Sequence, residues 1–316
     1  MSTLNNPGNL IRRLPGHKRA TTEDIIIDIV VHVSLVCLCL ITIYPFLNTL
    51  AYSFNNAIDS VRGGIYIWPR QFTLRNYEII LVNNPNISTA IINSAARAVA
   101  GGMLSVFACL CVSYVFSRRE FFLRKIFTPF LVFTMYFSGG LIPMFILIRN
   151  LGLINNFLVY LLPGMMSAYN VMVMRSFIEN LPDSLVEAAR IDGASEYRIL
   201  FKLILPLSLP AVATIALFVV VGQWNSWFDT MIYCSSEPKL TTLQYELQKL
   251  LTSAQNLAAS DAADAAMNLG DNTRAPVTPT SIRTAMTIIA VVPILFIYPF
   301  LQKYFVKGLT IGGVKG

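Results

Sequence analysis

Long apolar runs separated by shorter polar segments dominate this chain. A helix needs about 20 mainly apolar residues to cross a bilayer. Lipid offers no hydrogen-bond partner to the backbone, so a spanning segment must satisfy its own N–H and C=O groups as a helix. The pattern predicts an all-α, polytopic membrane helix bundle with six transmembrane helices. The six runs are Ile25–Phe54, Ala90–Phe116, Ile126–Ile148, Phe157–Ile178, Leu207–Tyr233 and Ile282–Phe305.

The polar segments between these runs divide the chain. Residues 1–24 form a basic tail, 25–306 the six-span transmembrane domain, and 307–316 a C-terminal tail. Within the transmembrane domain, the polar segments that matter below are 55–89, 179–206 and 235–281. The last of these carries an Ala- and Asp-rich stretch, 253–264, which fits either a solvated surface helix or loop or a contact with an extracellular partner.

Lys and Arg set the orientation of a membrane protein, because they concentrate on the cytoplasmic side. With the N-terminus inside, the inside segments hold about fifteen of these residues and the outside segments about eight. The bias predicts that both termini are inside, that segment 179–206 is cytoplasmic, and that segments 55–89 and 235–281 are outside.

Composition agrees with a membrane protein. The chain is 55% hydrophobic and 13% charged, with a mean hydropathy of +0.59, whereas soluble domains carry about 25% charged residues. The net charge of +7 follows from topology. No basic stripe with interleaved aromatics predicts a nucleic-acid partner. His17 and His32 lack metal-binding spacing, and the cysteines lie in apolar runs, so we expect neither a metal site nor a cofactor.

Segment 179–206 has the build of a docking element. Pro182 and Asp183 suit the first turn of a short helix. Gly193 can adopt the left-handed conformation that ends it. Ser195 can cap a second helix, and Pro206 can bend the chain into the fifth span. Alanines between these points keep the surface small, so another protein can approach closely. An ordinary connection between helices is the alternative.

The same segment resembles the E-A-A-x-x-x-G-x9-Φ-x-L-P loop (Φ apolar) of bacterial ATP-binding-cassette importer permeases. The matching positions are Glu187, Ala188, Ala189, Gly193, Leu203, Leu205 and Pro206. In that family the loop couples the permease to a cytoplasmic ATPase. The resemblance implies that the coupling residues here are Glu187, Ala188, Ala189, Asp192, Gly193, Phe201, Leu205 and Pro206.

The last residues, Lys307–Gly316, resemble the G-L-T-x-G-G-V-K-G tail of the maltose-type permease. In that family the tail reaches into the ATPase dimer, so docking is implied for Thr310, Gly312, Gly313 and Lys315. Two further stretches, Phe137–Pro143 and Leu151–Asn155, resemble the subgroup that serves complex or oligomeric saccharides. Phe137–Gly140 lacks the frame of a serine-hydrolase turn and indicates a helix boundary.

Together these resemblances imply the type I importer fold and a set of partners. They are a second permease subunit, a cytoplasmic ABC ATPase dimer, an extracellular solute-binding (lipo)protein and a carbohydrate, in a bacterial cell membrane. The chain has no G-x-x-x-x-G-K-[ST] loop, so it is expected to be no enzyme and to depend on a separate ATPase. A permease for another solute class, a secondary transporter and a membrane enzyme are the alternatives.

Polar residues within the fifth span are candidates for the substrate pathway, because polar groups in lipid are costly. A sugar needs aromatic faces and hydrogen-bonding groups, and the run supplies both: Gln223, Trp224, Asn225, Trp227 and Asp229. In a continuous helix, Trp224 and Trp227 share a face, and Asn225 and Asp229 share a neighbouring one. Polar contact between helices is the alternative.

Arg97, near the start of the second span, is the other intramembrane charge of interest. It can snorkel outward or pair across the bundle, or it can line the pathway.

Overall fold

The computed structural model describes residues 22–82, 84–265 and 278–312. Its main elements in these ranges are α-helices: α1 Thr22–Ser53, α2 Ala57–Val61, α3 Arg75–Leu81, α4 Ile87–Ser117, α5 Arg124–Tyr136, α6 Leu141–Asn150, α7 Ala168–Glu179, α8 Asp183–Ile191, α9 Glu196–Ile199, α10 Leu205–Leu207, α11 Leu209–Asn225, α12 Phe228–Tyr233, α13 Leu243–Ala265 and α14 Pro279–Gly312. Short non-α turns lie at Phe157–Tyr160, Leu200–Ile204 and Pro238–Leu240.

The chain forms two compact units, Met1–Asn48 and Thr49–Gly316. Most of α1 belongs to the first unit, and its stretch Ile26–Ser53 is long and apolar enough to cross a membrane. The second unit contains the remaining helices and both regions of functional interest.

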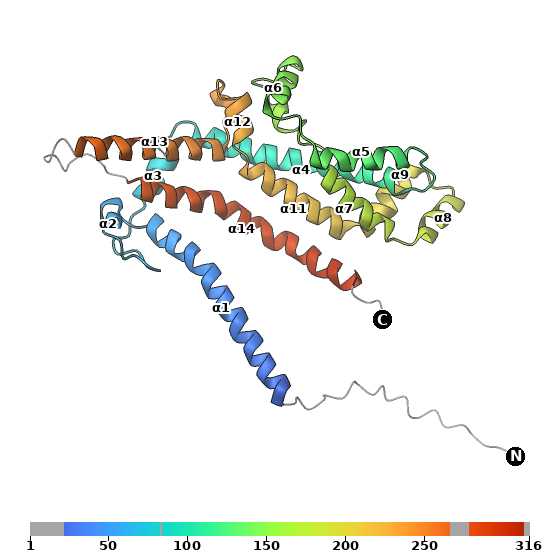
Figure 1. Cartoon of the computed structure of the whole chain (residues 1–316), viewed down its shortest axis with the longest axis horizontal. Helices are drawn as coiled ribbons and strands as arrows, with labels where there is room; N and C mark the ends of the chain where they lie inside the picture. Colours follow the sequence, from blue (N-terminus) through green and yellow to red (C-terminus); the bar gives the residue numbers. More distant parts are fainter. Residues whose placement is uncertain (1–21, 83, 266–277, 313–316) are drawn as a thin grey trace. The chain divides into compact units, whose positions relative to one another are not determined.

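The core of the second unit is built on α4, which lies beside α7 and α11, while α14 packs on α11 (Figure 1). Small residues form the buried stripe of α4 at intervals of three and four: Ser94, Ala98, Gly101, Gly102, Ser105 and Cys109. At Gly102 a Cβ would lie only 2.7 Å from Val220 of α11. Small residues let helices approach closely in membranes, and this stripe sets the α4–α11 contact.

Three described helices are long and apolar enough to span a membrane, or up to five if each bent pair counts as one span. The first, second and sixth predicted spans are confirmed as continuous helices, in α1, α4 and α14. The all-α class is likewise supported, since only an isolated bridge, Asn55 to Phe72, interrupts the helical pattern in the described residues.

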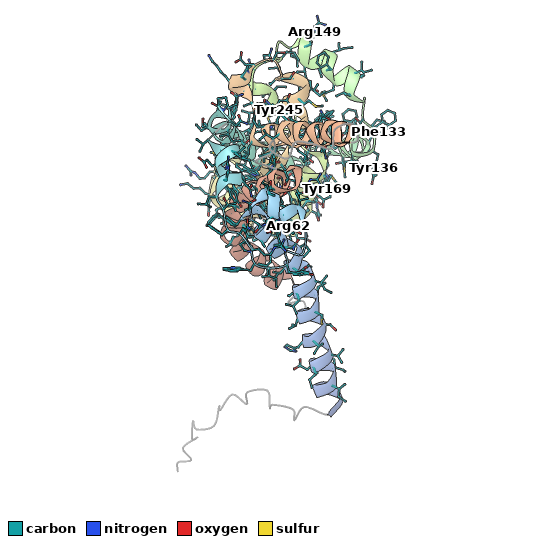
Figure 2. The ribbon with its side chains drawn as sticks, turned by 90° about the vertical axis from the view of Figure 1, so that its left-hand side faces the viewer. Arg62, Phe133, Tyr136, Arg149, Tyr169 and Tyr245 are labelled. Atoms are coloured by element: carbon teal, nitrogen blue, oxygen red, sulfur yellow. The ribbon has the colours of Figure 1, made fainter. Side chains whose placement is uncertain are left out.

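The third predicted span, Ile126–Ile148, is wrong as a single helix. Helices α5 and α6 meet at 115°. Gly140 has φ +85°, a conformation that L side chains rarely adopt, and it begins α6. The boundary expected at Phe137–Gly140 is therefore confirmed. Phe133 and Tyr136 at the end of α5 are 54% and 83% exposed and project away from the bundle (Figure 2).

The fourth and fifth predicted spans are also interrupted. In the fourth, a turn at Phe157–Tyr160 is followed by non-helical residues around Pro163 and Gly164, and α7 begins only after Ser167, whose side chain caps it. In the fifth, α11 ends at Asn225 and α12 begins at Phe228. The residues around the break in the fourth run are mainly apolar, whereas the break in the fifth lies within the polar stretch 223–229 and is flanked by apolar residues.

Candidate functional site

Segment 179–206 folds as two short helices joined by a tight turn, as expected. We call α8, the turn and α9 the helical hairpin (residues 183–199). Gly193 has φ +76°. Its N–H donates to Arg190 O, and the N–H of Ala194 donates to Ala189 O, both at 3.0 Å. This pair of bonds is the Schellman ending of a helix, and it requires the left-handed residue that glycine provides.

Two details of the hairpin differ from the sequence expectations. Pro182 precedes α8 as its N-cap residue and does not lie within the first turn. Ser195 occupies the N-cap position of α9, but its side chain makes no capping bond. The helix boundaries depend on the turn at Gly193 more than on side-chain capping.

One face of the hairpin is open to solvent. Glu187 and Ala188 are exposed, and so is Asp192 just before the turn. Ile191 and Tyr197, on either side of the turn, are 86% and 79% exposed. Among the described residues, none forms an ion pair with Glu187. This face therefore presents a free carboxylate between small and apolar side chains.

The other face is packed into the bundle. Val186 of α8 and Ile199 of α9 are buried in one apolar cluster with Ile215 of α11. The cluster also holds Leu110 and Tyr114 of α4. Burial on this side and exposure on the other fix which surface of the hairpin can meet a partner.

A network of ionic hydrogen bonds, which we call the Arg190 cluster, holds the hairpin to α4. Arg190 donates to both carboxylate oxygens of Glu120, at 2.6 and 3.0 Å, and to Glu196 at 2.9 Å. The hydroxyl of Tyr114 donates to the other oxygen of Glu196. Arg190 and Glu196 flank the turn, so the guanidinium links α8 to α9 and to Glu120 in the segment after α4, while Glu196 makes the bond to Tyr114 of α4.

The electrostatics of the Arg190 cluster favour its charged state. The hydrogen bond from Arg190 is the main reason that the pKa of Glu120 lies below its ordinary value. For Glu196, burial acts to raise the pKa, but hydrogen bonds from Tyr114 and Arg190 outweigh it and the pKa is lowered. Sequence reasoning missed these partners. The only signal for them was a basic residue inside the E-A-A stretch and an acid six positions later.

The hairpin continues directly into α11. A π-helical stretch, Leu200–Ile204, and α10 lead to an 82° bend before α11. The bend is at Ser208, two residues after the expected Pro206, and Pro210 follows it in the first turn of α11. Phe201 is 40% exposed and stacks on Phe107 of α4 with 6.3 Å between ring centroids. Leu205 is partly buried against the core.

The candidate polar residues of the fifth span separate around the break at Ser226 and Trp227. Both residues are non-helical, so the face-sharing expected of a continuous helix is wrong. Trp224 is buried and its indole N–H donates to Ala290 O of α14 at 3.1 Å. Asn225 and Asp229 line two different clefts.

The cleft that Asp229 lines, which we call the Arg97 cleft, has a volume of about 380 Å³. It is lined by residues of α4, α7, α11 and α12 and of the Phe157–Tyr160 turn. Arg97 is 1% exposed and lies 4.4 Å from the ring centroid of Tyr160. It is ion-paired with Asp229 of α12. Of the two alternatives considered for Arg97, it pairs across the bundle and does not snorkel outward. It also lines this cleft.

All N–H donors of the Arg97 guanidinium are engaged in hydrogen bonds. A guanidinium carries five N–H donors. Its Nε and Nη2 donate to Gln223 Oε1 at 3.0 and 2.9 Å, Nη1 donates to Ser226 O at 3.4 Å, and Nη1 and Nη2 donate to the two oxygens of Asp229. The guanidinium therefore fastens the helix break to α4. Tyr160, whose backbone O accepts from Gln223 Nε2 at 3.1 Å, was not anticipated from the sequence.

The second cleft, which we call the Arg283 cleft, also has a volume of about 380 Å³ and lies between the end of α11, α13 and α14. Asn225 and Trp227 line it together with residues of both other helices. Asn225 Oδ1 accepts from Gln244 Nε2 of α13 at 3.4 Å. The candidate residues thus divide between the two clefts: Gln223, Asp229 and Arg97 line the Arg97 cleft, and Asn225 and Trp227 line the Arg283 cleft.

The predicted C-terminal docking residues are only partly described. The backbone of α14 remains helical through Gly312, so Thr310 and Gly312 belong to that helix. Gly313 and Lys315 lie outside the described residues. In the part of the chain that the structure describes, no group of three or more His, Cys, Asp or Glu residues could hold a metal ion.

Comparison with known proteins agrees with this architecture. Residues 101–311 match the family described as "Binding-protein-dependent transport system inner membrane component". The chain belongs to this family. It is thus a multi-pass inner-membrane permease component of a binding-protein-dependent transporter, a transport subunit and not the ATPase.

Individual relatives extend the match over most of the chain. The chain is 34% identical over 289 residues to the polygalacturonan/rhamnogalacturonan transport system permease protein YtcP of Bacillus subtilis, covering 92% of this chain and 98% of that protein. It is 30% identical over 280 residues to the arabinooligosaccharides transport system permease protein AraQ of Halalkalibacterium halodurans, covering 87% and 92%.

A solved structure shows the same fold. It is a chain of a bacterial ABC transporter involved in the import of the acidic polysaccharide alginate, with a TM-score of 0.75 and 29% identity, covering 90% of this chain and 98% of the other. The resemblance to ATP-binding-cassette importer permeases noted in the sequence is therefore confirmed.

Proposed function

We propose that this chain is one of two non-identical permease subunits of an ATP-driven importer for oligosaccharides. The family supplies the transport role. Several relatives are named as permeases for oligo- or polysaccharides, and a structural neighbour belongs to an importer of a polysaccharide. An extracellular solute-binding (lipo)protein would deliver the sugar, and a cytoplasmic ABC ATPase dimer would supply the energy.

The proposed topology has six spans with both termini inside. Helices α1, α4 and α14 supply three spans, and the two bent pairs supply two more. The turn at Phe157–Tyr160 together with α7 would supply the remaining one. This arrangement is supported by the Lys and Arg bias and places the helical hairpin in the cytoplasm.

The observation that carries the proposal is the exposed Glu187, which has no ion-pair partner among the described residues, on a hairpin whose opposite face is buried. A partner that offers a basic group could pair with Glu187 and contact Ala188 and Asp192, while Ala189 packs partly against the core. The hairpin is covalently continuous with α11 and bonded to α4 through Tyr114 and Glu196. Movement of the ATPase would therefore reach both helices at once. Alternating access by rigid-body motion follows from that attachment.

The substrate pathway would pass the helix break at Ser226 and Trp227, because each of these two residues lines one of the two clefts. In this proposal Gln223, Asp229 and Arg97 shape one wall of the pathway, while Asn225 and Trp227 offer groups to the sugar. Trp224 supports α11 on α14. Thr310, Gly312, Gly313 and Lys315 of the C-terminus would extend the contact with the ATPase.

Glu187→Lys tests the coupling role. Placing a like charge against a basic partner should abolish most sugar uptake, while the chain remains inserted and keeps its thermal stability. Uptake and ATP hydrolysis would be measured in proteoliposomes containing the co-purified complex. Glu78→Lys in α3 is the matched control, since Glu78 is also exposed and lies on an outside segment. Normal uptake by Glu187→Lys would overturn the proposal.

A further inference from the structure

The Arg283 cleft differs from the Arg97 cleft in its charge. Of the residues that line it, Arg283 is the one cation and none is acidic. Arg283 is exposed, and the described residues offer it no ion pair. In the Arg97 cleft, by contrast, the guanidinium is neutralised by Asp229 and all its donors are used. Two clefts of similar volume therefore present a net positive charge and a near-neutral surface, respectively.

The polar groups around Arg283 suit a sugar ring. Three amide side chains, an indole and a hydroxyl line the cleft together with Arg283: Asn225, Gln244, Gln248, Trp227 and Thr287. The amides make one long hydrogen bond among themselves, Gln244 Nε2 to Asn225 Oδ1 at 3.4 Å. Amides so lightly engaged can still donate to and accept from hydroxyl groups. An aromatic face with a few convergent polar groups in a cleft of several hundred Å³ is typical of a small-molecule site.

We infer that the Arg283 cleft is a binding subsite for an acidic saccharide, with Arg283 pairing with the carboxylate of a uronate residue. The planar guanidinium fork matches a carboxylate with two parallel hydrogen bonds. Trp227 covers the C–H face of the ring, and the amides contact its hydroxyls. This inference rests on the proposed function and narrows its substrate class from oligosaccharides to uronate-containing ones.

The helix break is what creates the subsite. Had α11 continued through residue 229, Asn225 and Asp229 would lie on one face. The interruption at Ser226 and Trp227 directs Asp229 to Arg97 and leaves Trp227 and Asn225 beside Arg283. The carboxylate of Asp229, which would otherwise lie on the same face as Asn225, is thereby committed to Arg97.

The test measures binding to the purified transporter complex in phosphatidylcholine vesicles, without the solute-binding protein. The probe is trigalacturonate, compared with its fully methyl-esterified form, which has the same rings and no carboxylate. Binding is followed by equilibrium dialysis and by the change in tryptophan fluorescence, and a fluorescence change that Trp227→Phe lacks at saturating saccharide is assigned to Trp227.

Trigalacturonate should bind in a salt-sensitive manner, and the methyl ester about tenfold more weakly, the loss expected for one partly exposed charge-assisted hydrogen-bonded pair. Arg283→Gln should remove that preference and Arg283→Lys should keep part of it. The matched control is Arg149→Gln in α6, an exposed arginine that does not line the cleft (Figure 2). It should bind as the unaltered chain does.

Two results would overturn the inference. One is equal affinity for the acid and its ester, with import of a neutral oligosaccharide by the same vesicles once the solute-binding protein and ATP are added; the proposed function would then stand without the subsite. The other is a Trp227 response that depends on Arg283 but appears with phosphatidylglycerol vesicles and no saccharide, which would assign the cleft to an anionic lipid headgroup. Failure to import any saccharide would count against both proposals.

Discussion

Arg97 and Arg190 each make several ionic hydrogen bonds to carboxylates, but Arg97 is buried and Arg190 is partly exposed to solvent. Arg97 is 1% exposed and joins α4 to a break in a membrane helix. The side chain of Arg190 is 33% exposed, its partners Glu120 and Glu196 are 67% and 53% exposed, and it joins the helical hairpin to the segment that follows α4. Water screens the second cluster and hardly reaches the first. Each ionic hydrogen bond should therefore contribute far more to stability at Arg97 than at Arg190.

The comparison also assigns different tasks to the two ends of α4. Its Arg97 end is fastened to α11 and α12 by a saturated guanidinium. Its Tyr114 end is attached to the hairpin through Glu196, whose exposed carboxylate can exchange a protein partner for water or for another protein. We expect the first end to move as a fixed unit and the second to respond to a partner.

Loss of the buried cation should have the largest effect. Arg97→Ala leaves Asp229 without its partner, and breaking a buried ion pair costs about 3–5 kcal/mol. Because the Asp229 side chain is 23% exposed, we expect about 3 kcal/mol, near the lower end. The melting temperature and yield of the complex in detergent would show it. The double variant Arg97→Gln with Asp229→Asn should recover much of the loss. An unchanged melting temperature for Arg97→Ala would contradict a stabilising role for the Arg97–Asp229 ion pair.

A change at the hairpin turn should have an intermediate effect. Gly193 needs a left-handed conformation, which costs a residue with a Cβ about 1–2 kcal/mol. Open space around its Cα means that conformation, and not a clash, sets the cost. Gly193→Val should increase amide hydrogen exchange in residues 183–199 and weaken ATPase co-purification. Gly193→Asn is the control, because asparagine tolerates this conformation better. If Gly193→Val and Gly193→Asn behaved identically, the left-handed conformation of Gly193 would not be what the hairpin requires.

Loss of the exposed cation should be milder. Arg190→Gln removes bonds that are partly exposed, so we expect less than about 1 kcal/mol, reduced further by salt. Hydrogen exchange of the hairpin at low and high ionic strength measures this. Arg198→Gln on α9, an exposed arginine with no ion pair among the described residues, provides the control. A loss as large as that of Arg97→Ala would remove the contrast between the two clusters.

Lowering the pH should have the smallest effect, a loss of stability of the Arg190 cluster. The pKa values of Glu120 and Glu196 are lowered from 4.5 in the folded chain. Their contribution is thus fully present above pH 4.5 and is lost as the pH falls through the lowered values. Hairpin protection should be flat from pH 7 to 5 and decline only below that. In Arg190→Gln this acid-dependent decline should be weaker. A decline that begins near neutral pH would contradict the assignment.

Local chemistry made the hairpin predictable. Gly193 ends α8 and Pro206 precedes the bend because caps, left-handed glycines and prolines act within a few residues of themselves. The composition likewise determined the all-α membrane class, and α1, α4 and α14 follow the apolar runs closely.

Breaks inside apolar runs and contacts between distant segments were decided by the tertiary structure. Hydropathy does not distinguish a straight span from the bent pair α5–α6, because lipid and a protein interior both accept apolar side chains. Arg97 and Asp229 are separated by 132 positions, and their pairing depends on how α4 rotates against α11. That rotation is set by the fit of small residues such as Gly102 against Val220, which exists only once the helices meet.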